Sequence, residues 1–475
     1  MSRSALPSQS SDFPAWYGEV VRRAELAENS LVRGAMVIKP YGYAIWELVQ
    51  RALDDRIKAT GHENVYFPLF VPSSVLERES ELVEGFAPEV AVVTHAGGKQ
   101  LEEPLVVRPT SEAVIWATYA RWIQSYRDLP LLYNQWGNVV RWELRPRLFL
   151  RTTEFLWQEG HTAHETEADA IGEALRILYE VYADTAEQVL AMPVLRGRKS
   201  DSERFPGAVE TFTIEALMRD GKALQAGTSH FFGQNLARTY GVRFTDRDGG
   251  EQHPYATSWG ASTRLVGGLI MTHGDDRGLR LPPAAAPYQV VIVPVPGAGV
   301  GQAAARLATE FRAAGVRVQL DDREEQRPGF KFNEWELKGV PVRCELGERD
   351  VVAGAATLVR RDTGAKEQVP LTAVGTRVVE LLDEIQQRLH DEASAFRSDH
   401  TLTDPAGYDE LREFLSGAGG FAEAPWCGSL ACEALVKEET RATIRCLDVE
   451  PGDVGGRCLV CGSDAAERAT WAQAY

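Results

Sequence analysis

The apolar pattern near the N-terminus predicts an amphipathic helix that runs into a strand. In residues 43–61 (YAIWELVQRALDDRIKATG) apolar positions recur at helical spacing, and Gly61 is placed to end the helix. Residues 63–72 (ENVYFPLFVP) have the composition of a strand. Because proline cannot donate a ladder hydrogen bond, Pro68 within this strand predicts a sheet edge or a subunit interface.

A second pattern, in residues 138–161 (NVVRWELRPRLFLRTTEFLWQEGH), predicts two strands joined by a basic loop. We expect the first strand to end at residues 141–143 and the return strand to begin at residue 152. Side chains two residues apart share one face of a strand, so Arg141 and Glu143 are expected to point at one ligand. A guanidinium suits a phosphate, a carboxylate can accept from an adenine amino group, and Phe155 offers a ring for stacking. The alternative is an exposed hairpin whose charges are solvated.

A third element, in residues 257–270 (TSWGASTRLVGGLI), combines a glycine, small hydroxyl residues and an arginine. Gly260 is expected to let the backbone approach a ligand closely. Arg264 follows Ser262 and Thr263 and opens an apolar helical run. Because a helix N-terminus with an arginine beside it attracts anions, this element predicts a phosphate site.

The pattern changes after a proline- and alanine-rich linker (LPPAAAPY, residues 281–288). From Tyr288 strands alternate with helices: strands at residues 288–295, 316–322 and 341–347, and helices at 303–315 and 330–339. A hairpin follows at residues 357–371, and a closing helix at 371–389. This alternation predicts a parallel sheet with right-handed crossovers. A further region begins near Thr401.

Length and charge set the limits on function. A chain of 475 residues implies two or three domains. Apolar runs such as residues 290–295 are too short to span a bilayer, and the N-terminus has no secretory signal, so we expect a cytoplasmic protein without membrane contact. The net charge of −17 argues against a nucleic-acid partner only weakly, because such binding depends on local basic faces.

Five of the six cysteines lie in the last fifty residues. Cys427 and Cys432 form one close pair, and Cys458 and Cys461 form another. Four thiolates in two close pairs suit a structural Zn²⁺, because they leave no open coordination position. Cys446 is expected to be buried, although it could replace a member of a pair. The alternative is a group of buried, reduced thiols.

In this order, the first three elements resemble motifs 1, 2 and 3 of the class II aminoacyl-tRNA synthetases. RPTSE (residues 108–112), FLWQEGH (155–161) and QAGTSHFFGQ (225–234) together resemble the prolyl-tRNA synthetase family, and the likeness extends over the whole chain. It implies an α+β catalytic domain with an antiparallel sheet (residues 1–283), an α/β anticodon-binding domain (284–392) and a small α+β zinc-binding domain (393–475). Residues 160–225 are too few to hold an inserted editing domain, so the likeness is to the branch with a C-terminal extension.

The resemblance implies that proline reacts with ATP to give prolyl-adenylate, from which proline passes to the 3′ end of tRNA(Pro). Such a step needs charge neutralisation and positioning, with Mg²⁺ on the triphosphate, and no protein nucleophile. Arg141 and Arg264 would be catalytic. The ATP contacts implied are Arg141, Glu143, Arg151, Thr152, Phe155, Gln225, Thr228, Ser262 and Arg264. The proline contacts implied are Thr110, Glu112, Arg141, Trp157, Glu159, His161, Phe205 and His230.

Proline is a secondary ammonium with two N–H donors. Thr110 and Glu112, at i and i+2, can both face it, although such a pair is more often a helix cap. An apolar pocket cannot exclude the smaller alanine by sterics, so any editing must use another route or another protein.

The resemblance also implies a homodimer and an anticodon contact, for which Lys331, Phe332, Glu345 and Arg349 are candidates. The terminal Tyr475 is expected to fold back towards the active site, because Trp471 and Tyr475 are four residues apart and could share one helical face. The alternative is a frayed tail. Two alternatives remain open: a synthetase for threonine or histidine, and a non-catalytic paralogue that acts as a binding or regulatory module. The TSE and WQEGH segments argue against the first, and intact Arg141, Glu143 and Arg264 argue against the second.

Overall fold

One large sheet organises the part of the molecule that the sequence predicts to be catalytic, called the catalytic body below. The computed structural model describes residues 6–78, 90–450, 452 and 454–475. Within them the strand order of this sheet is β20-β21-β23-β22-β9-β10-β11-β14-β8-β7-β3. From β9 to β7 neighbouring strands are antiparallel, and β3 joins β7 in parallel. These catalytic strands are β3 (Glu63–Asn64), β7 (Leu131–Val140), β8 (Glu154–His164), β9 (Val194–Arg198), β10 (Glu210–Leu217), β11 (Ala223–Gly233) and β14 (Tyr255–Ser262).

Two apolar cores form around this sheet. The larger combines α1, α2, α8 and the π-helical segments with the central strands, and includes Trp16, Trp46 and Trp259. The smaller lies around α5 and α7, and includes Trp116 and Phe232. The helical elements are α1 (Phe13–Arg23), α2 (Pro40–Ala59), α3 (Ser73–Leu76), α5 (Glu112–Trp122), α6 (Glu167–Arg176), η3 (Ile177–Ala183), η4 (Thr185–Val189), α7 (Asn235–Tyr240) and α8 (Arg264–His273), with short 3₁₀ turns at η2 (Tyr126–Asp128) and η5 (Pro283–Ala285).

The first predicted element is confirmed in its helix and wrong in its strand. Gly61, at φ +91°, directly follows the last residues of α2. The expected strand is instead two short strands, β3 and β4 (Phe70–Pro72), with Pro68 between them and outside both. Buried side chains satisfy the backbone at this break, because Arg108 donates to the Phe67 carbonyl at 2.7 Å and Gln135 accepts from the Phe67 amide. Side-chain hydrogen bonds have therefore replaced the ladder.

Smaller sheets complete this part of the chain. β4 pairs with β6 (Lys99–Val107), which pairs with β5 (Ala91–Ala96). β1 (Ala27–Asn29) pairs with β2 (Met36–Ile38), and β12 (Phe244–Thr245) with β13 (Glu251–Gln252). Between β8 and β11, the chain is occupied by α6, η3, η4, β9 and β10, which belong to the catalytic body. The expectation that no editing domain is inserted there is confirmed.

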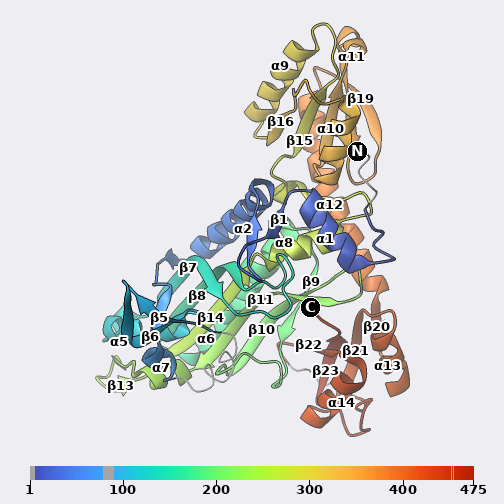
Figure 1. The fold of residues 1–475 in the computed structure, drawn as a ribbon. Coiled ribbons are helices and arrows are strands. Elements are labelled where there is room, and N and C mark those ends of the chain that lie inside the picture. The colour runs from blue at the N-terminus through green and yellow to red at the C-terminus, as the bar shows by residue number, and fades with distance from the viewer. Residues whose placement is uncertain (1–5, 79–89, 451, 453) are drawn as a thin grey trace.

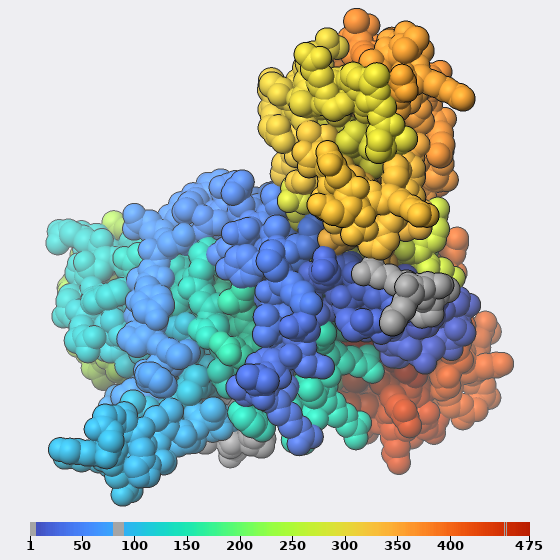
Figure 2. Space-filling view, turned by 45° about the horizontal axis from the view of Figure 1, so that its top comes forward, coloured from blue at the N-terminus to red at the C-terminus, as the bar shows by residue number. Residues whose placement is uncertain are grey.

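The second body follows the predicted alternation. Its sheet has the order β16-β15-β17-β18-β19, with β15 parallel to both β16 and β17 and with β18 and β19 forming an antiparallel hairpin. The short helix α11 was not predicted. The elements are β15 (Val290–Pro294), α9 (Val300–Ala313), β16 (Val318–Leu320), α10 (Pro328–Leu337), β17 (Val342–Leu346), α11 (Glu348–Ala353), β18 (Ala355–Arg360), β19 (Lys366–Pro370) and α12 (Val374–Asp399). This body stands out from the rest of the molecule in yellow to orange (Figure 2).

The C-terminal body extends the catalytic sheet. β22 reaches β9 through a bridge between Leu447 and Arg198, so one sheet runs through both (Figure 1). Its elements are β20 (Thr401–Thr403), α13 (Tyr408–Ser416), β21 (Phe421–Trp426), α14 (Leu430–Thr440), β22 (Thr443–Leu447) and β23 (Glu467–Ala472). The idea that Trp471 and Tyr475 share a helical face is wrong, because Trp471 lies in β23. The predicted fold class, α+β followed by α/β and a small α+β unit, is confirmed.

No helix of the described ranges is both long enough and apolar enough to cross a membrane.

Candidate active site

All sixteen residues expected to contact proline or ATP line one pocket, with a cavity of about 240 Å³. The floor is formed by β8, β11 and β14, and the walls by the start of α5, the loop between β7 and β8, and the loop between β9 and β10. The pocket brings together Thr110, Glu112, Arg141, Glu143, Arg151, Thr152, Phe155, Trp157, Glu159, His161, Phe205, Gln225, Thr228, His230, Ser262 and Arg264.

The basic hairpin is confirmed, but its strands are shorter than expected. β7 ends at Val140 and β8 begins at Glu154, so Arg141 and Glu143 lie in the connecting loop. The ladder ends because the Thr153 amide turns away to the Gly34 carbonyl, at 2.8 Å. The Arg141 Nε donates to the Pro109 carbonyl at 3.0 Å, and its guanidinium lies 5.7 and 5.6 Å from the ring centroids of Phe155 and Trp157. These contacts aim Arg141 into the pocket.

One end of the pocket is strongly cationic. Arg264 begins α8, and its Nε donates to the Leu150 carbonyl at 3.0 Å. Burial, followed by the charges of Arg151 and Arg141, lowers the pKa of Arg264 to about 10, so it stays protonated at neutral pH. Arg151 also pairs with Glu143 at 2.6 Å. A polyanion at this end would relieve the repulsion among the three guanidinium groups.

Gly260 has a structural role that the sequence did not indicate. A Cβ atom at this position would lie 2.2 Å from the Trp157 ring. Glycine is therefore required to make room for Trp157, which lines the pocket together with Gly260. The expected close approach of a ligand to this backbone stays a prediction.

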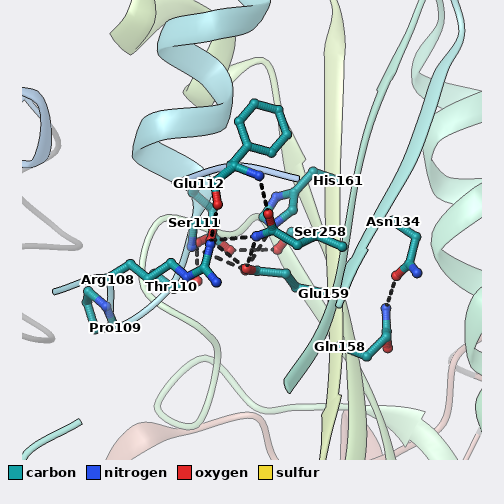
Figure 3. Close-up of polar contacts among 12 residues, drawn as sticks. Arg108, Pro109, Thr110, Ser111, Glu112, Asn134, Gln158, Glu159, His161 and Ser258 are labelled. Atoms are coloured by element: carbon teal, nitrogen blue, oxygen red, sulfur yellow. Dashed lines mark hydrogen bonds and ion pairs between the residues drawn. The ribbon is translucent and has the colours of Figure 1, made fainter. Parts of the chain in front are cut away.

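The opposite end of the pocket is buried and acidic. Thr110 Oγ1 donates to Glu112 Oε2, and Ser258 Oγ donates to Glu112 Oε1 at 3.0 Å (Figure 3). Thr110 and Glu112 lie at the start of α5, whose N-cap residue, Ser111, makes no capping hydrogen bond with its side chain. The Thr110 hydroxyl is directed at the carboxylate, so the alternative of a helix cap does not apply.

A second carboxylate supports this end from below. Glu159 accepts from the Ser111 hydroxyl, from Gln135 Nε2 at 2.9 Å and from His161 Nε2 at 3.2 Å (Figure 3). Burial alone would raise the pKa of Glu159, but the hydrogen bond and charge of His161 outweigh it and lower that pKa to about 2. Burial alone would lower the pKa of His161, but its hydrogen bond with Glu159 and the nearby Glu112 raise it. The two form a buried ion pair.

His230 completes the wall in its neutral form. Burial, then the charges of His161 and Arg141, lower its pKa to about 3. Its Nδ1 lies 3.0 Å from Thr211 Oγ1, and its ring lies 4.5 Å from that of Phe205.

Sequence reasoning missed three polar residues that line the pocket. Ser258 holds Glu112, Thr211 holds His230, and Glu203 lies on the loop between β9 and β10. Ser258 lies within the third motif, two residues before Gly260, and its position on the pocket side of a strand could have indicated it. Thr211 and Glu203 carry no comparable signal.

The cysteine cluster is separate from this pocket. The Sγ atoms of Cys427, Cys432, Cys458 and Cys461 all lie within 4.8 Å of one another. Cys432 and Cys458 are buried, Cys427 is partly buried and Cys461 is exposed. Cys446 lies elsewhere, on β22, and burial raises its pKa to about 12. Four sulfur donors converging on one point match the ligand set of a closed tetrahedral Zn²⁺ site.

The chain end docks beside the basic loop. The Tyr475 hydroxyl donates to Asp220 Oδ2 at 2.7 Å, and its amide donates to the Ala223 carbonyl at 3.2 Å. The Arg147 guanidinium lies 5.7 Å from the Tyr475 ring centroid. Tyr475 therefore touches the loop from outside the pocket described above.

One candidate anticodon contact is unsuitable. Lys331 is buried, and its Nζ donates to the Asp321 carbonyl at 2.9 Å. Glu345 pairs with Arg343 at 2.8 Å, and the Arg343 guanidinium lies 4.5 Å from the Phe332 ring centroid. Arg349 is exposed on α11.

Comparisons with models of known protein families identify the class of protein. The model of the class II tRNA synthetase core domain (G, H, P, S and T) matches residues 94–273. The anticodon binding domain model matches residues 289–381, and the model of the C-terminal domain of prolyl-tRNA synthetase matches residues 408–475. The catalytic body is therefore a class II aminoacyl-tRNA synthetase core.

Full-length relatives then identify the family. The proline–tRNA ligases of Roseiflexus sp. (strain RS-1) and Chloroflexus aurantiacus are 51% and 53% identical over 484 residues, covering 100% of each chain. That of Flavobacterium johnsoniae is 52% identical over 490 residues, covering 99% of each. The crystal structure of a prolyl-tRNA synthetase from Cryptosporidium parvum, complexed with halofuginone and AMPPNP, matches with a TM-score of 0.95 and 38% identity over 99% of both chains. The chain belongs to the proline–tRNA ligase family, and ligation of proline to tRNA is its function.

Proposed function

We propose that the pocket carries out proline activation by ATP, with Arg141 and Arg264 as its catalytic residues. The observation that supports this most strongly is the polarity of the cavity, which has a buried carboxylate at one end, a group of guanidiniums at the other, and Arg141 between them. Such a cavity suits a zwitterionic amino acid placed next to a polyanion.

The reaction joins the two ends. A carboxylate oxygen of proline attacks the α-phosphorus of ATP, the bond to the bridging oxygen of the β-phosphate breaks, and pyrophosphate leaves. Arg141 holds the attacking carboxylate and the α-phosphate together, which lowers their mutual repulsion and aligns them. Arg264 holds the γ-phosphate. Mg²⁺ enters with the triphosphate as part of the nucleotide substrate. The prolyl group then passes to the terminal ribose hydroxyl of tRNA(Pro).

On this assignment, polar groups bind the proline ammonium and ring side chains surround its apolar part. Glu112 and the Thr110 hydroxyl accept from the two N–H donors of its ammonium. Trp157 and Phe205 line the ring pocket, and His230, held neutral, adds no charge beside the ammonium. Glu159 and His161 support these residues from behind. Glu159 accepts from the Ser111 amide and pairs with His161, and these contacts hold the start of α5 in place.

The cationic end binds the nucleotide. Glu143 accepts from the adenine amino group, and Phe155 stacks on the base. Arg151 neutralises phosphate charge once it exchanges its contact with Glu143 for the nucleotide. Thr152, Gln225, Thr228 and Ser262 complete the polar lining of this end.

A homodimer is supported by the surface around Pro68. Tyr66 and Phe70, on either side of it, are 71% and 46% exposed. Large apolar side chains at this level of exposure are typical of surfaces that a partner covers. Light scattering at micromolar concentration is expected to give twice 52.4 kDa. A monomer would contradict the assignment.

The remaining assignments concern the other bodies. We place anticodon binding on the second body, near a cavity of about 190 Å³ lined by Arg343, Arg360 and Lys366. We divide the chain into domains at residues 283/284 and 392/393, although α12 runs continuously across the second boundary. The four clustered cysteines would hold a structural Zn²⁺, which would cross-link the C-terminal body. The enzyme acts in the cytoplasm.

Proline-dependent ATP–pyrophosphate exchange on the purified protein tests the proposal. Of the twenty amino acids, proline is expected to support exchange at the lowest concentration. Exchange that depends on threonine or histidine instead would show that the proline assignments are wrong.

A further inference from the structure

The C-terminal body contacts the loop between β9 and β10 directly. This loop spans residues 199–209 and lies where the two parts of the large sheet meet, at the bridge between Leu447 and Arg198. The loop carries Glu203 and Phe205, which both line the active-site pocket. A contact that shifts this loop from outside would therefore also shift residues that line the pocket.

Two serines of the loop are anchored by one carboxylate of α14. Ser200 Oγ and Ser202 Oγ each donate to Glu433 Oε1 at 2.7 Å. Glu433 is only 2% exposed, and its Oε2 has no hydrogen-bond partner among the residues that the structure describes. Because a buried carboxylate is costly unless it is hydrogen-bonded, the two serines and Glu433 fix each other's positions.

A second anchor acts on Glu203. Its carboxylate pairs with Lys437 at 3.2 Å and with Arg445 at 3.6 Å. Arg445 itself donates three hydrogen bonds to Glu215 of β10, at 3.0, 3.1 and 3.2 Å, and Glu215 is fully buried. Arg445, a residue of the C-terminal body, thus links Glu203 of the loop to Glu215 of the catalytic sheet.

The anchored loop ends at the amino-acid end of the pocket. Two residues after Glu203, the Phe205 amide donates to Thr211 Oγ1 at 3.0 Å. That oxygen also lies 3.0 Å from His230 Nδ1, and the Phe205 and His230 rings are 4.5 Å apart. The position of the loop therefore sets the position of the ring wall.

We propose that Glu433, with Lys437 and Arg445, positions the loop of residues 199–209 and thereby sets the affinity of the active site for its amino-acid substrate. These three are positioning residues of the C-terminal body, since they act through Ser200, Ser202 and Glu203. The inference rests on the proposed function, in which Phe205 and His230 form part of the wall of the proline pocket. It gives the C-terminal body a part in amino-acid recognition besides its contribution to the fold.

The test is ATP–pyrophosphate exchange on the full chain, with Glu433→Ala, Glu433→Gln and Ser202→Ala. Glu433→Ala is expected to raise the KM for proline about tenfold, equivalent to about 1.4 kcal/mol of lost binding, because the released loop no longer holds the Phe205 wall in place. The KM for ATP and the kcat per active site should change less than twofold. Glu433→Gln retains an acceptor for both serines, so it should recover most of the affinity. Ser202→Ala should raise the KM for proline about threefold, in a variant that leaves the buried residues in place.

Glu438→Gln is the matched control, because Glu438 lies on the same helix and is exposed. It should leave both KM values unchanged. The double variant Ser202→Ala/Glu433→Ala should be no worse than Glu433→Ala, because both substitutions remove one interaction. If Glu433→Ala and Ser202→Ala lower the melting temperature but leave the KM for proline unchanged, the contacts only stabilise the fold and the inference is wrong. A wild-type enzyme without proline-dependent exchange would contradict the proposed function instead.

Discussion

The two ends of the active-site pocket differ in whether their charged groups are already paired within the protein. At the amino-acid end, the buried carboxylates are already hydrogen-bonded: Glu112 by Thr110 and Ser258, and Glu159 by Ser111 and His161. At the nucleotide end, burial and then the charges of Arg151 and Arg141 lower the pKa of Arg264, so the three guanidiniums are not paired with anions to the same extent.

On the proposed assignment of proline to one end and ATP to the other, this difference follows from the ligands. Proline is small and carries no net charge, so its affinity depends on geometry fixed in advance. A nucleotide triphosphate carries several negative charges, so its binding can release electrostatic repulsion within the protein. Substitutions at the two ends should therefore affect different substrates.

Arg141→Ala should have the largest effect, because this side chain serves both ends. Loss of a charge-stabilising donor costs about 3–4 kcal/mol, so we expect kcat for exchange to fall about a thousandfold. Arg145→Ala, on the same loop, is the control and should retain most of its activity. If Arg141→Ala kept a tenth of the wild-type kcat, the two ends would not meet at Arg141.

Glu112→Ala should affect proline selectively. It removes the anionic acceptor of the ammonium, a charge-assisted interaction of about 2–3 kcal/mol, so the KM for proline should rise about 30- to 100-fold. The KM for ATP should change little. Equal effects on both substrates, measured in the same exchange assay, would count against the division of the pocket.

Arg264→Ala should show the opposite selectivity at a smaller magnitude. It removes a phosphate contact but also relieves repulsion on Arg141 and Arg151, so we expect about a tenfold rise in the KM for ATP, worth about 1.4 kcal/mol. The KM for proline should stay within twofold. Arg264→Lys keeps the charge and should give an intermediate value.

His161 and His230, both at the amino-acid end, should make the stability of the protein depend on pH in opposite directions, with small effects. The pKa of His161 is raised in the folded state, so its contribution is complete below the unfolded pKa and is lost as pH rises through the folded value. The pKa of His230 is lowered to about 3, so its contribution is complete above about 6.5 and is lost as pH falls towards 3.

Denaturant unfolding from pH 5 to 9 measures this. Relative to wild type, His161→Gln should lose less stability as pH rises above 6.5, and His230→Gln should lose less as pH falls below it. Identical pH profiles for the two variants would mean that the assigned charge states are wrong.

Much of this pocket could be predicted from the sequence because its elements carry local signals. The arginine and hydroxyl residues before an apolar helical run identify the start of α8, and charges two residues apart identify the basic hairpin. What could not be predicted depends on contacts between distant segments. The break at Pro68 depends on Arg108 and Gln135, and the shortened strands of the hairpin depend on the carbonyl of Gly34.

The C-terminal body shows the same limit. The four clustered cysteines are close in sequence and were predicted together. The joining of β22 to β9 and the anchoring of the loop by Glu433 connect residues more than 200 positions apart, and no spacing indicates them. Trp471 was misplaced because a spacing of four suggests a helix, whereas β23 is fixed by its pairing with β21 and β22.

The most direct test of the two-ended pocket is a double-mutant cycle in ATP–pyrophosphate exchange with Glu112→Ala, Arg264→Ala and the double variant. Because the proposed function assigns the two side chains to different substrates, their effects on the free energy of the transition state should add to within about 0.5 kcal/mol. The rise in the KM for proline caused by Glu112→Ala should be the same with or without Arg264. If the second substitution costs far less than it does alone, the two groups act as one unit, and the separation of the ends is wrong.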